Sequence, residues 1–163
     1  MAAVNVYIFP SKTVENIRRG IEHQKWAIAP VRSARVHSNR RTKAERMPIP
    51  SRGLFYCSDP GDKFFTTPFI ITSRPVDRKE EGIWDEPWVL PFTIKPIGDL
   101  SFRLSRGEAA AKWPFYRDAQ NPGFVVGPLG VFVPVSIADE EWNGLLMALG
   151  VIPPELFENA ISN

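Results

Sequence analysis

Three tryptophans occupy positions from which their side chains could bind a ligand. Trp26 lies in the segment Lys-Trp-Ala-Ile, and Trp84 and Trp88 lie together in the segment Gly-Ile-Trp-Asp-Glu-Pro-Trp. An indole has a flat π-face and one N–H donor, so it can stack on a nucleobase or enclose a methyl group. The same side chains could instead fill a hydrophobic core, where most large aromatic residues are buried. The pattern therefore allows two interpretations, a ligand cage and a core.

Positive charge is concentrated in one segment of the chain. The net charge is only +2, but residues 32–52 contain seven Lys or Arg residues against one acid, Glu45, and no Lys or Arg follows Arg117. Arginines interspersed with Ser, Asn and His suit contact with phosphates, although a charged run is also typical of a solvated loop. The residues expected to contact a nucleic-acid backbone are Arg32, Arg35, Arg40, Arg41, Lys43 and Arg46.

The composition limits the chemistry that the chain can perform. Its 163 residues correspond to one domain, or to one domain with a tail. The single cysteine, Cys57, excludes an internal disulfide and a multi-cysteine zinc site, and the two histidines, His23 and His37, supply a metal centre poorly. We therefore expect no metal and no cofactor. No apolar run is long enough to span a bilayer and no signal peptide is apparent, so no membrane association and a cytoplasmic location are the default expectations.

The first third of the chain predicts a strand, a helix and a strand. Residues 4–9 alternate and favour a strand that ends at Pro10. Ser11 or Thr13 can cap a helix that extends to about His23, and residues 26–28 then favour a short strand. Residues 30–50 are basic and lack clear periodicity, so they are expected to form a long loop.

The rest of the chain predicts further strands and two helices. Strands are expected over residues 53–58, 64–73 and 88–95, with Pro68 marking an edge or a bulge, and the last strand over residues 130–135. A charged loop is expected over residues 77–81 and an irregular loop over residues 116–122. A capping box formed by Ser105 and Glu108 opens a short helix through Lys112, and a second helix is expected over residues 139–149.

This order of elements predicts an α+β fold. A strand and a helix are followed by several strands joined by turns and by a terminal strand and helix. Such an order indicates a curled, mostly antiparallel sheet with helices at its rim. We expect one domain over residues 1–150, and a tail or the start of a linker over residues 151–163.

Four segments, in this order, resemble the EVE family of the PUA-like superfamily and its sister family, the YTH domains. The opening strand and helix leading to Lys-Trp-Ala at Trp26, and the segment containing Trp84 and Trp88, resemble the YTH segments that carry cage tryptophans. The strand Arg-Gly-Leu-Phe-Tyr-Cys-Ser, ending at Ser58, resembles the EVE strand that ends in Phe-Tyr-His-Ser. The segment Pro-Val-Ser-Ile-Ala-Asp-Glu-Glu-Trp, ending at Trp142, resembles the C-terminal signature of EVE domains.

The resemblance implies a PUA-like fold, a curled and mostly antiparallel β-barrel or sheet flanked by helices, with a pocket for one nucleobase. YTH domains read N6-methyladenine in RNA, and EVE domains are implicated in reading modified cytosine in DNA, some of them fused to HNH nucleases. The function implied is therefore a reader of a modified base. We expect the base to be 5-methylcytosine or 5-hydroxymethylcytosine in double-stranded DNA, flipped into an aromatic pocket.

The resemblance also suggests the residues of such a pocket. Trp26 and Trp84 are expected to face each other with accessible faces, and Trp88 to form a wall. The side chains expected to line the pocket or to contact the edge of the base are Ser33, Ser58, Tyr56, Asp118 and Asn121. The alternatives for these residues are a turn cap for Ser58, core packing for Tyr56, and loop formation for Asp118 and Asn121. Trp113 and Trp142 are assigned to packing.

No catalytic site is evident in the sequence. An HNH nuclease needs several His and Asn residues in a metal-binding unit, and no combination of nucleophile, base and acid has supporting context. The resemblance to EVE domains implies a reader that is either free-standing or the recognition module of a modification-dependent endonuclease. In the second case a nuclease domain would follow downstream and could also mediate dimerisation. The alternatives are a reader of a modified base in RNA, and a PUA-like module that binds a small molecule or a protein.

Overall fold

Alternate residues of one central strand point to opposite faces of the sheet. In β1 (Ala3–Ser11) the side chains of Val6 and Ile8 belong to one buried cluster, and those of Tyr7 and Phe9 belong to another. Both sets are buried, so the sheet is covered on both faces. The computed structural model describes residues 3–114, 131–150 and 154–162.

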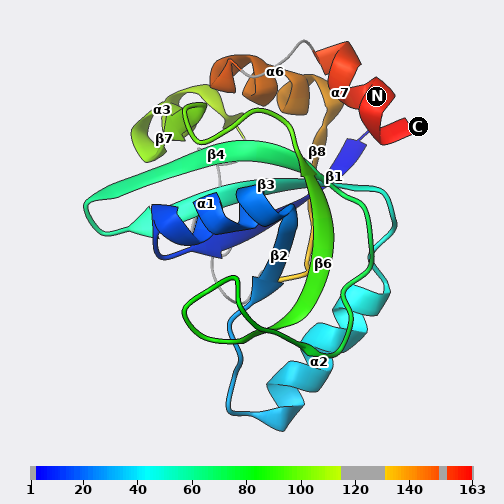
Figure 1. Ribbon diagram of the computed structural model, residues 1–163. Coiled ribbons are helices and arrows are strands. Elements are labelled where there is room, and N and C mark those ends of the chain that lie inside the picture. Colours follow the sequence, from blue (N-terminus) through cyan, green and yellow to red (C-terminus); the bar gives the residue numbers. More distant parts are fainter. Residues whose placement is uncertain (1–2, 115–130, 151–153, 163) are drawn as a thin grey trace.

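Strands and helices follow one another along the chain in the order shown in Figure 1. After β1, the remaining elements are α1 (Val14–His23), β2 (Lys25–Ile28), α2 (Ala34–Glu45), β3 (Ser51–Asp59), β4 (Asp62–Ile71), β5 (Lys79–Glu80), β6 (Trp88–Pro96), β7 (Arg103–Ser105), α3 (Arg106–Lys112), β8 (Val135–Ala138), α6 (Asp139–Leu149) and α7 (Pro154–Ser162).

The strands form a mixed and mostly antiparallel sheet in the order β2-β6-β4-β3-β1-β8. The pair β1 and β3 is parallel, because the chain crosses over through α1, β2 and α2 between them, and the other recorded pairs are antiparallel. β5 pairs with β6, and β7 pairs with β4. The predicted α+β fold with a curled, mostly antiparallel sheet is confirmed.

The two faces of the sheet are covered by different helices (Figure 1). On one face, which we call the helix face, α3, α6 and α7 cover a core that contains Trp113, Trp142 and Phe157. On the other face, which we call the tryptophan face, α1 and β2 cover a core that contains Trp26 and Trp84. Trp113 and Trp142 are buried, which confirms their assignment to packing.

A β-bulge divides β4 into two halves. Leu54 of β3 pairs with Pro68 and the next residue, Phe55, pairs with Thr66, so Thr67 is the additional residue, and its φ is +42°. The half after the bulge pairs with β6, and the half before it pairs with β7. Pro68 was predicted to mark an edge or a bulge, and it lies at a bulge. Proline lacks a backbone N–H, and a bulge is one of the positions in a sheet where that donor is not needed.

The basic segment forms a helix, and the prediction of a long loop was wrong. α2 spans Ala34–Glu45, and Ser33 caps it by accepting a hydrogen bond from the Val36 N–H (3.2 Å). The helix has almost no apolar stripe, because only Ala44 is buried along its length. Prediction from periodicity fails for such a helix, since its stability comes from capping, helix-forming residues and polar contacts.

The last strand begins later than predicted. β8 spans Val135–Ala138, whereas the strand was expected over residues 130–135. Phe132 has a φ of +60°, the left-handed region that a strand does not use, and its ring packs edge-on against Phe9 with centroids 5.7 Å apart. The apolar residues before β8 therefore pack into the tryptophan face as a turn rather than extend the sheet.

Other local predictions are confirmed or need small corrections. The Glu108 N–H donates to Ser105 Oγ (3.1 Å) and the Ser105 N–H donates to the Glu108 carboxylate (3.3 Å), so the capping box of α3 is present. The helix over residues 139–149 is present as α6. The charged segment 77–81 is not wholly a loop, because β5 pairs with β6 within it. In the described part of the chain, no helix is long and apolar enough to cross a membrane.

Candidate nucleic-acid interface

The three predicted tryptophans meet in one cluster on the tryptophan face. Trp26 comes from β2, Trp84 from the segment before β6, and Trp88 from the first position of β6. Trp84 and Trp88 are stacked, with centroids 4.3 Å apart and planes 13° from parallel. Trp26 meets both edge-on, at 5.6 Å from Trp84 and 5.3 Å from Trp88.

The orientation expected for these indoles was wrong. Trp26 and Trp84 were expected to face each other with open faces, but their planes lie at 84° and only 2% and 5% of the two residues is exposed. The parallel pair is Trp84 and Trp88 instead, and Trp88 is partly exposed. At a separation of 4.3 Å the two indoles are in contact with each other.

A glycine in α1 allows Trp26 to pack beneath the helix. A Cβ on Gly20 would lie 2.7 Å from Trp26 Cε3 and 2.9 Å from the Lys25 carbonyl oxygen, both closer than van der Waals contact permits. Glycine costs a helix about 1 kcal/mol relative to alanine. The absence of a side chain at Gly20 is what allows α1 to approach the strand that carries Trp26 so closely.

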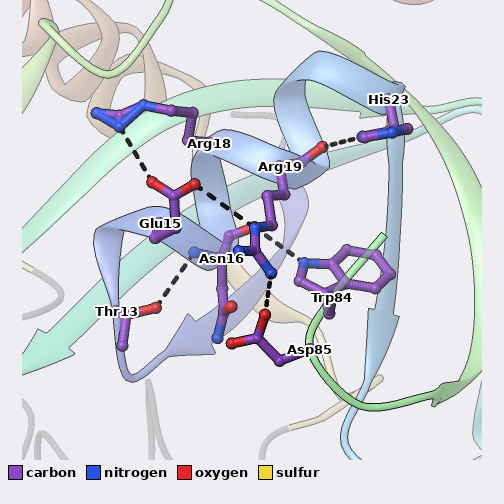
Figure 2. Close-up of polar contacts among 8 residues, drawn as sticks. All are labelled: Thr13, Glu15, Asn16, Arg18, Arg19, His23, Trp84 and Asp85. Carbon is purple, nitrogen blue, oxygen red and sulfur yellow. Dashed lines mark hydrogen bonds and ion pairs between the residues drawn. The ribbon is translucent and has the colours of Figure 1, made fainter. Parts of the chain in front are cut away.

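Helix α1 also holds the segment that carries Trp84 (Figure 2). The Trp84 Nε1–H donates to the main-chain carbonyl of Asn16 (3.0 Å), and the Asp85 carboxylate accepts from Arg19 (2.7 Å). Arg19 is oriented in turn by Glu15 at 3.5 Å. Trp84 is therefore fixed by its own N–H and by the ion pair of its neighbour, whereas Trp88 makes no hydrogen bond through its indole within the described residues.

A partly buried ion pair joins β2 to the strands beside Trp88. Lys25 Nζ donates to Glu80 (2.7 Å), and Arg78 lies 3.5 Å from the same carboxyl group. Glu80 is opposite Trp88 in the pairing of β5 with β6. The Lys25 ammonium, assisted by Arg78, holds the pKa of the Glu80 carboxyl below its ordinary value although burial opposes this.

The tryptophan cluster borders a cavity of about 610 Å³. We call it the tryptophan cavity, and its size lies within the range of roughly 300–1,000 Å³ that is typical of ligand pockets. Six of the residues predicted from the sequence line it: Trp26, Trp84, Trp88, Tyr56, Ser58 and Arg40. The structure thus brings together residues that lie in four separate segments of the chain.

Two of the polar residues at the cavity are already engaged elsewhere. Ser58 Oγ donates to the Ser11 carbonyl (3.2 Å), so it ties β3 to β1. Tyr56 lines the cavity, but its ring packs against Phe65 in the core of the helix face, with centroids 4.9 Å apart. Ser33 caps α2 and is not among the described residues that line the cavity. Asp118 and Asn121 lie outside the described residues.

Sequence reasoning missed several residues of the cavity wall. Asn16, Lys12 and Lys63 line it. Asn16 is the residue whose carbonyl holds Trp84, and its side-chain amide makes no hydrogen bond within the described part of the chain. Its position in the first turns of the predicted helix, near the end of the predicted first strand, is the only signal that could have indicated it.

The predicted backbone-binding residues are distributed around α2. Arg32 precedes the helix, Arg35, Arg40, Arg41 and Lys43 lie on it, and Arg46 is its C-terminal cap. Four of these cations are exposed and form no ion pair within the described residues: Arg32, Arg35, Lys43 and Arg46. This helix therefore presents positive charge to the solvent beside the cavity that Arg40 lines.

One aspartate fastens α2 to the body of the domain. Asp77 accepts from Arg41 (3.1 Å), and its other oxygen lies 2.9 Å from His37 Nε2. The hydrogen bonds from His37 and then from Arg41 hold the pKa of the Asp77 carboxyl below its ordinary value. Since His37 and Arg41 are four residues apart, they share one side of the helix.

The fold is similar to that of YTH domains of known structure. The YTH domain of Toxoplasma CPSF4 in complex with a 7-mer m6A-modified RNA superposes with a TM-score of 0.54 at 18% identity, over 90% of this chain and 89% of that one. The YTH domain of Zygosaccharomyces rouxii MRB1, in complex with N6-methyladenosine RNA, gives 0.53 at 12% identity, over 90% and 86%.

A bacterial structure shares the same architecture. Protein Atu2648 from Agrobacterium tumefaciens superposes with a TM-score of 0.50 at 17% identity, over 92% of this chain and 97% of that one. No protein-family model matches the sequence, and no curated protein sequence matches it either. At these identities the comparisons establish the fold, and any function has to be argued from the site.

Proposed function

We propose that this protein binds nucleic acid and reads one modified base in the tryptophan cavity. The observation that carries the proposal is the parallel pair of Trp84 and Trp88 beside a cavity of about 610 Å³, with Trp26 closing the inner side. Helix α2, which carries exposed cations, contributes Arg40 to the wall of this cavity, and its charge suits contact with phosphates. The YTH domains of similar fold bind N6-methyladenosine RNA, which also supports the proposal.

The base enters between Trp84 and Trp88. Their planes are already parallel, so a translation of one indole creates two facing walls. Trp88 is the one that moves, because Trp84 is held by the Asn16 carbonyl and by the Arg19–Asp85 ion pair beside it. Separating an aromatic pair costs about 0.5–1.5 kcal/mol, whereas each base–aromatic stack contributes about 1–3 kcal/mol, so insertion is favourable.

The edge of the base is read by a polar group in the cavity wall. The side-chain amide of Asn16 is suited to this, because it offers both a donor and an acceptor and is not engaged elsewhere in the described part of the chain. Ser58 is less suited, since its hydroxyl already donates to Ser11. The methyl group of a modified base would lie against an indole face, which excludes water from it.

Two nucleic acids are candidates for this site. RNA that contains N6-methyladenosine is favoured by the ligands of the similar YTH domains. Double-stranded DNA that contains 5-methylcytosine or 5-hydroxymethylcytosine is favoured by the EVE-like strand that ends at Ser58 and the EVE-like segment that ends at Trp142. In the second case the chain is the recognition module of a modification-dependent endonuclease.

A panel of matched oligonucleotides tests the proposal. Fluorescence anisotropy would compare a short RNA with and without one N6-methyladenosine, and a DNA duplex with and without one 5-methylcytosine or 5-hydroxymethylcytosine. We expect one modified member to bind at least about tenfold more tightly than its unmodified counterpart, as one additional stacked and enclosed contact provides. Equal binding within every pair would refute the reading of a modification.

A further inference from the structure

Arg40 places a positive charge in the wall of the tryptophan cavity, without an acidic partner among the described residues. The residue is partly buried on α2 and lines the same cavity as the three tryptophans. It makes no ion pair or hydrogen bond with other described residues, and burial alone lowers the pKa of its guanidinium. An arginine remains charged at neutral pH, and a charge withdrawn from water normally has a partner of opposite sign.

The neighbouring arginine differs in this respect. Arg41 lies 3.1 Å from Asp77, which also contacts His37, so its charge is neutralised where α2 meets the body of the domain. Successive residues of a helix are rotated by about 100°, so Arg40 points in a different direction from Arg41. The contact with Asp77 therefore fixes the helix in the orientation that brings Arg40 to the cavity.

The rest of the cavity wall is compatible with an anionic ligand. Lys12 and Lys63 also line it, and neither forms an ion pair within the described residues. Two carboxylates line it as well, but Asp85 is neutralised by Arg19 at 2.7 Å and Glu86 is exposed to solvent. Described cations without a partner thus outnumber the one described carboxylate without a partner.

We propose that Arg40 binds the phosphate of the same nucleotide whose base is read between Trp84 and Trp88. The smallest ligand of the site is then a nucleoside monophosphate rather than a nucleobase or a nucleoside, an inference that rests on the proposed function. The planar guanidinium can donate two parallel hydrogen bonds to a phosphate, which fixes the nucleotide in one orientation as well as attracting it. Arg32, Arg35, Lys43 and Arg46 would contact phosphates of neighbouring nucleotides.

Titration calorimetry with single nucleotides tests this assignment. The probes are N6-methyladenosine and 5-methyl-2′-deoxycytidine, each as the nucleoside and as its 5′- and 3′-monophosphates. For the base that the protein prefers, one monophosphate should bind at least about tenfold more tightly than the nucleoside, as expected for a hydrogen bond between charged groups. Arg40→Gln, which removes the charge but keeps most of the stem, should abolish that advantage, and Arg40→Lys should retain part of it.

Lys95→Ala is the control, because Lys95 is an exposed cation of β6 that does not line the tryptophan cavity and forms no ion pair within the described residues. It should keep the full preference for the monophosphate. Thermal unfolding of each variant verifies that the fold is retained. Equal binding of nucleoside and monophosphates by the wild-type protein would overturn the assignment, as would an undiminished advantage in Arg40→Gln.

The unmodified monophosphates separate this inference from the proposed function. If the phosphate advantage persists but modified and unmodified nucleotides bind equally, the modification is not read and Arg40 still binds a phosphate. If the modified base is preferred without any phosphate advantage, the reading function stands and the role of Arg40 is refuted. If no nucleoside or monophosphate binds at all, both proposals are contradicted.

Discussion

The two faces of the sheet bury tryptophans equally well but pack them differently. On the helix face, Trp142 is fully buried and meets Phe157 of α7 edge-on at 5.5 Å. On the tryptophan face, Trp26 is buried to almost the same extent, yet it lies beside a parallel indole pair and a cavity of about 610 Å³. The degree of burial of a tryptophan therefore does not distinguish a core from a binding site. In this protein, the stacked geometry of the neighbouring indoles and the adjacent cavity are what mark the candidate site.

The largest expected effect lies on the helix face. Trp142→Ala should lower the free energy of unfolding by about 3–5 kcal/mol, the usual cost of truncating a fully buried large aromatic residue. Because this side chain lies on the far side of the sheet from the cavity, the ratio of modified to unmodified binding should not change. Chemical denaturation and the oligonucleotide panel, below the melting temperature, measure the two quantities. A change in the ratio would mean that the two faces are coupled.

On the tryptophan face, Trp88→Ala should change binding and should affect stability less than Trp142→Ala does. Trp88 is partly exposed, so its loss should affect stability less than that of Trp142. Binding loses one base stack of about 1–3 kcal/mol but no longer has to separate the indole pair, which costs about 0.5–1.5 kcal/mol. The net loss of about 1 kcal/mol is roughly fivefold in affinity. Tighter binding by this variant would show that Trp88 only blocks the cavity.

Gly20→Ala tests how tightly α1 packs against Trp26 and Lys25 on the tryptophan face. Alanine should favour the helix by about 1 kcal/mol, but its Cβ would lie 2.9 Å from the Lys25 carbonyl oxygen and would press on Trp26. Overpacking of this kind costs about 1–3 kcal/mol, so we expect a net destabilisation of up to about 2 kcal/mol. A raised melting temperature would show that α1 can move away from β2. Gly107→Ala in α3 is the control, since nothing lies near its added Cβ.

The smallest effect concerns the ion pair of Lys25 with Glu80. Because folding lowers the pKa of Glu80, the unfolded chain binds a proton more readily in the acid range. The pair should therefore stabilise the fold above the ordinary pKa of a glutamate, about 4.3, and this contribution should disappear as the pH falls through the lower value of the folded state. Between pH 6 and 3, the melting temperature of Glu80→Gln should fall less than that of the wild type. Parallel curves for the two proteins would contradict this contribution.

Local chemistry made much of the fold predictable from the sequence. Alternation identified β1, and the pairing of Ser105 with Glu108 identified the start of α3. The helix α2 was missed because prediction relied on apolar periodicity, whereas the described contacts of this helix include its cap at Ser33 and an ion pair with the distant Asp77. Contacts between residues so far apart leave no local pattern.

The candidate site was predictable only in part for the same reason. The indoles of Trp84 and Trp88 could be identified by their position in a recognisable segment, but their stacking depends on how α1 and β6 pack. Lys12 and Lys63 were missed because they reach the cavity from two separate strand ends. No spacing within the sequence indicates that these ends meet.

The β-bulge at Thr67 and Pro68 divides β4 into two halves that pair with different strands along one edge. The half of β4 after it pairs with β6, which carries Trp88, and the half before it pairs with β7, which leads into α3. The bulge thus separates these two pairings along one edge of β4, whereas β3 pairs with both halves along the other edge. If a base enters between the indoles as proposed, a small tilt of β6 would act on the half of β4 after the bulge, and not directly on the half that pairs with β7. In that case the side that carries the tryptophans would open while the helix face keeps its packing.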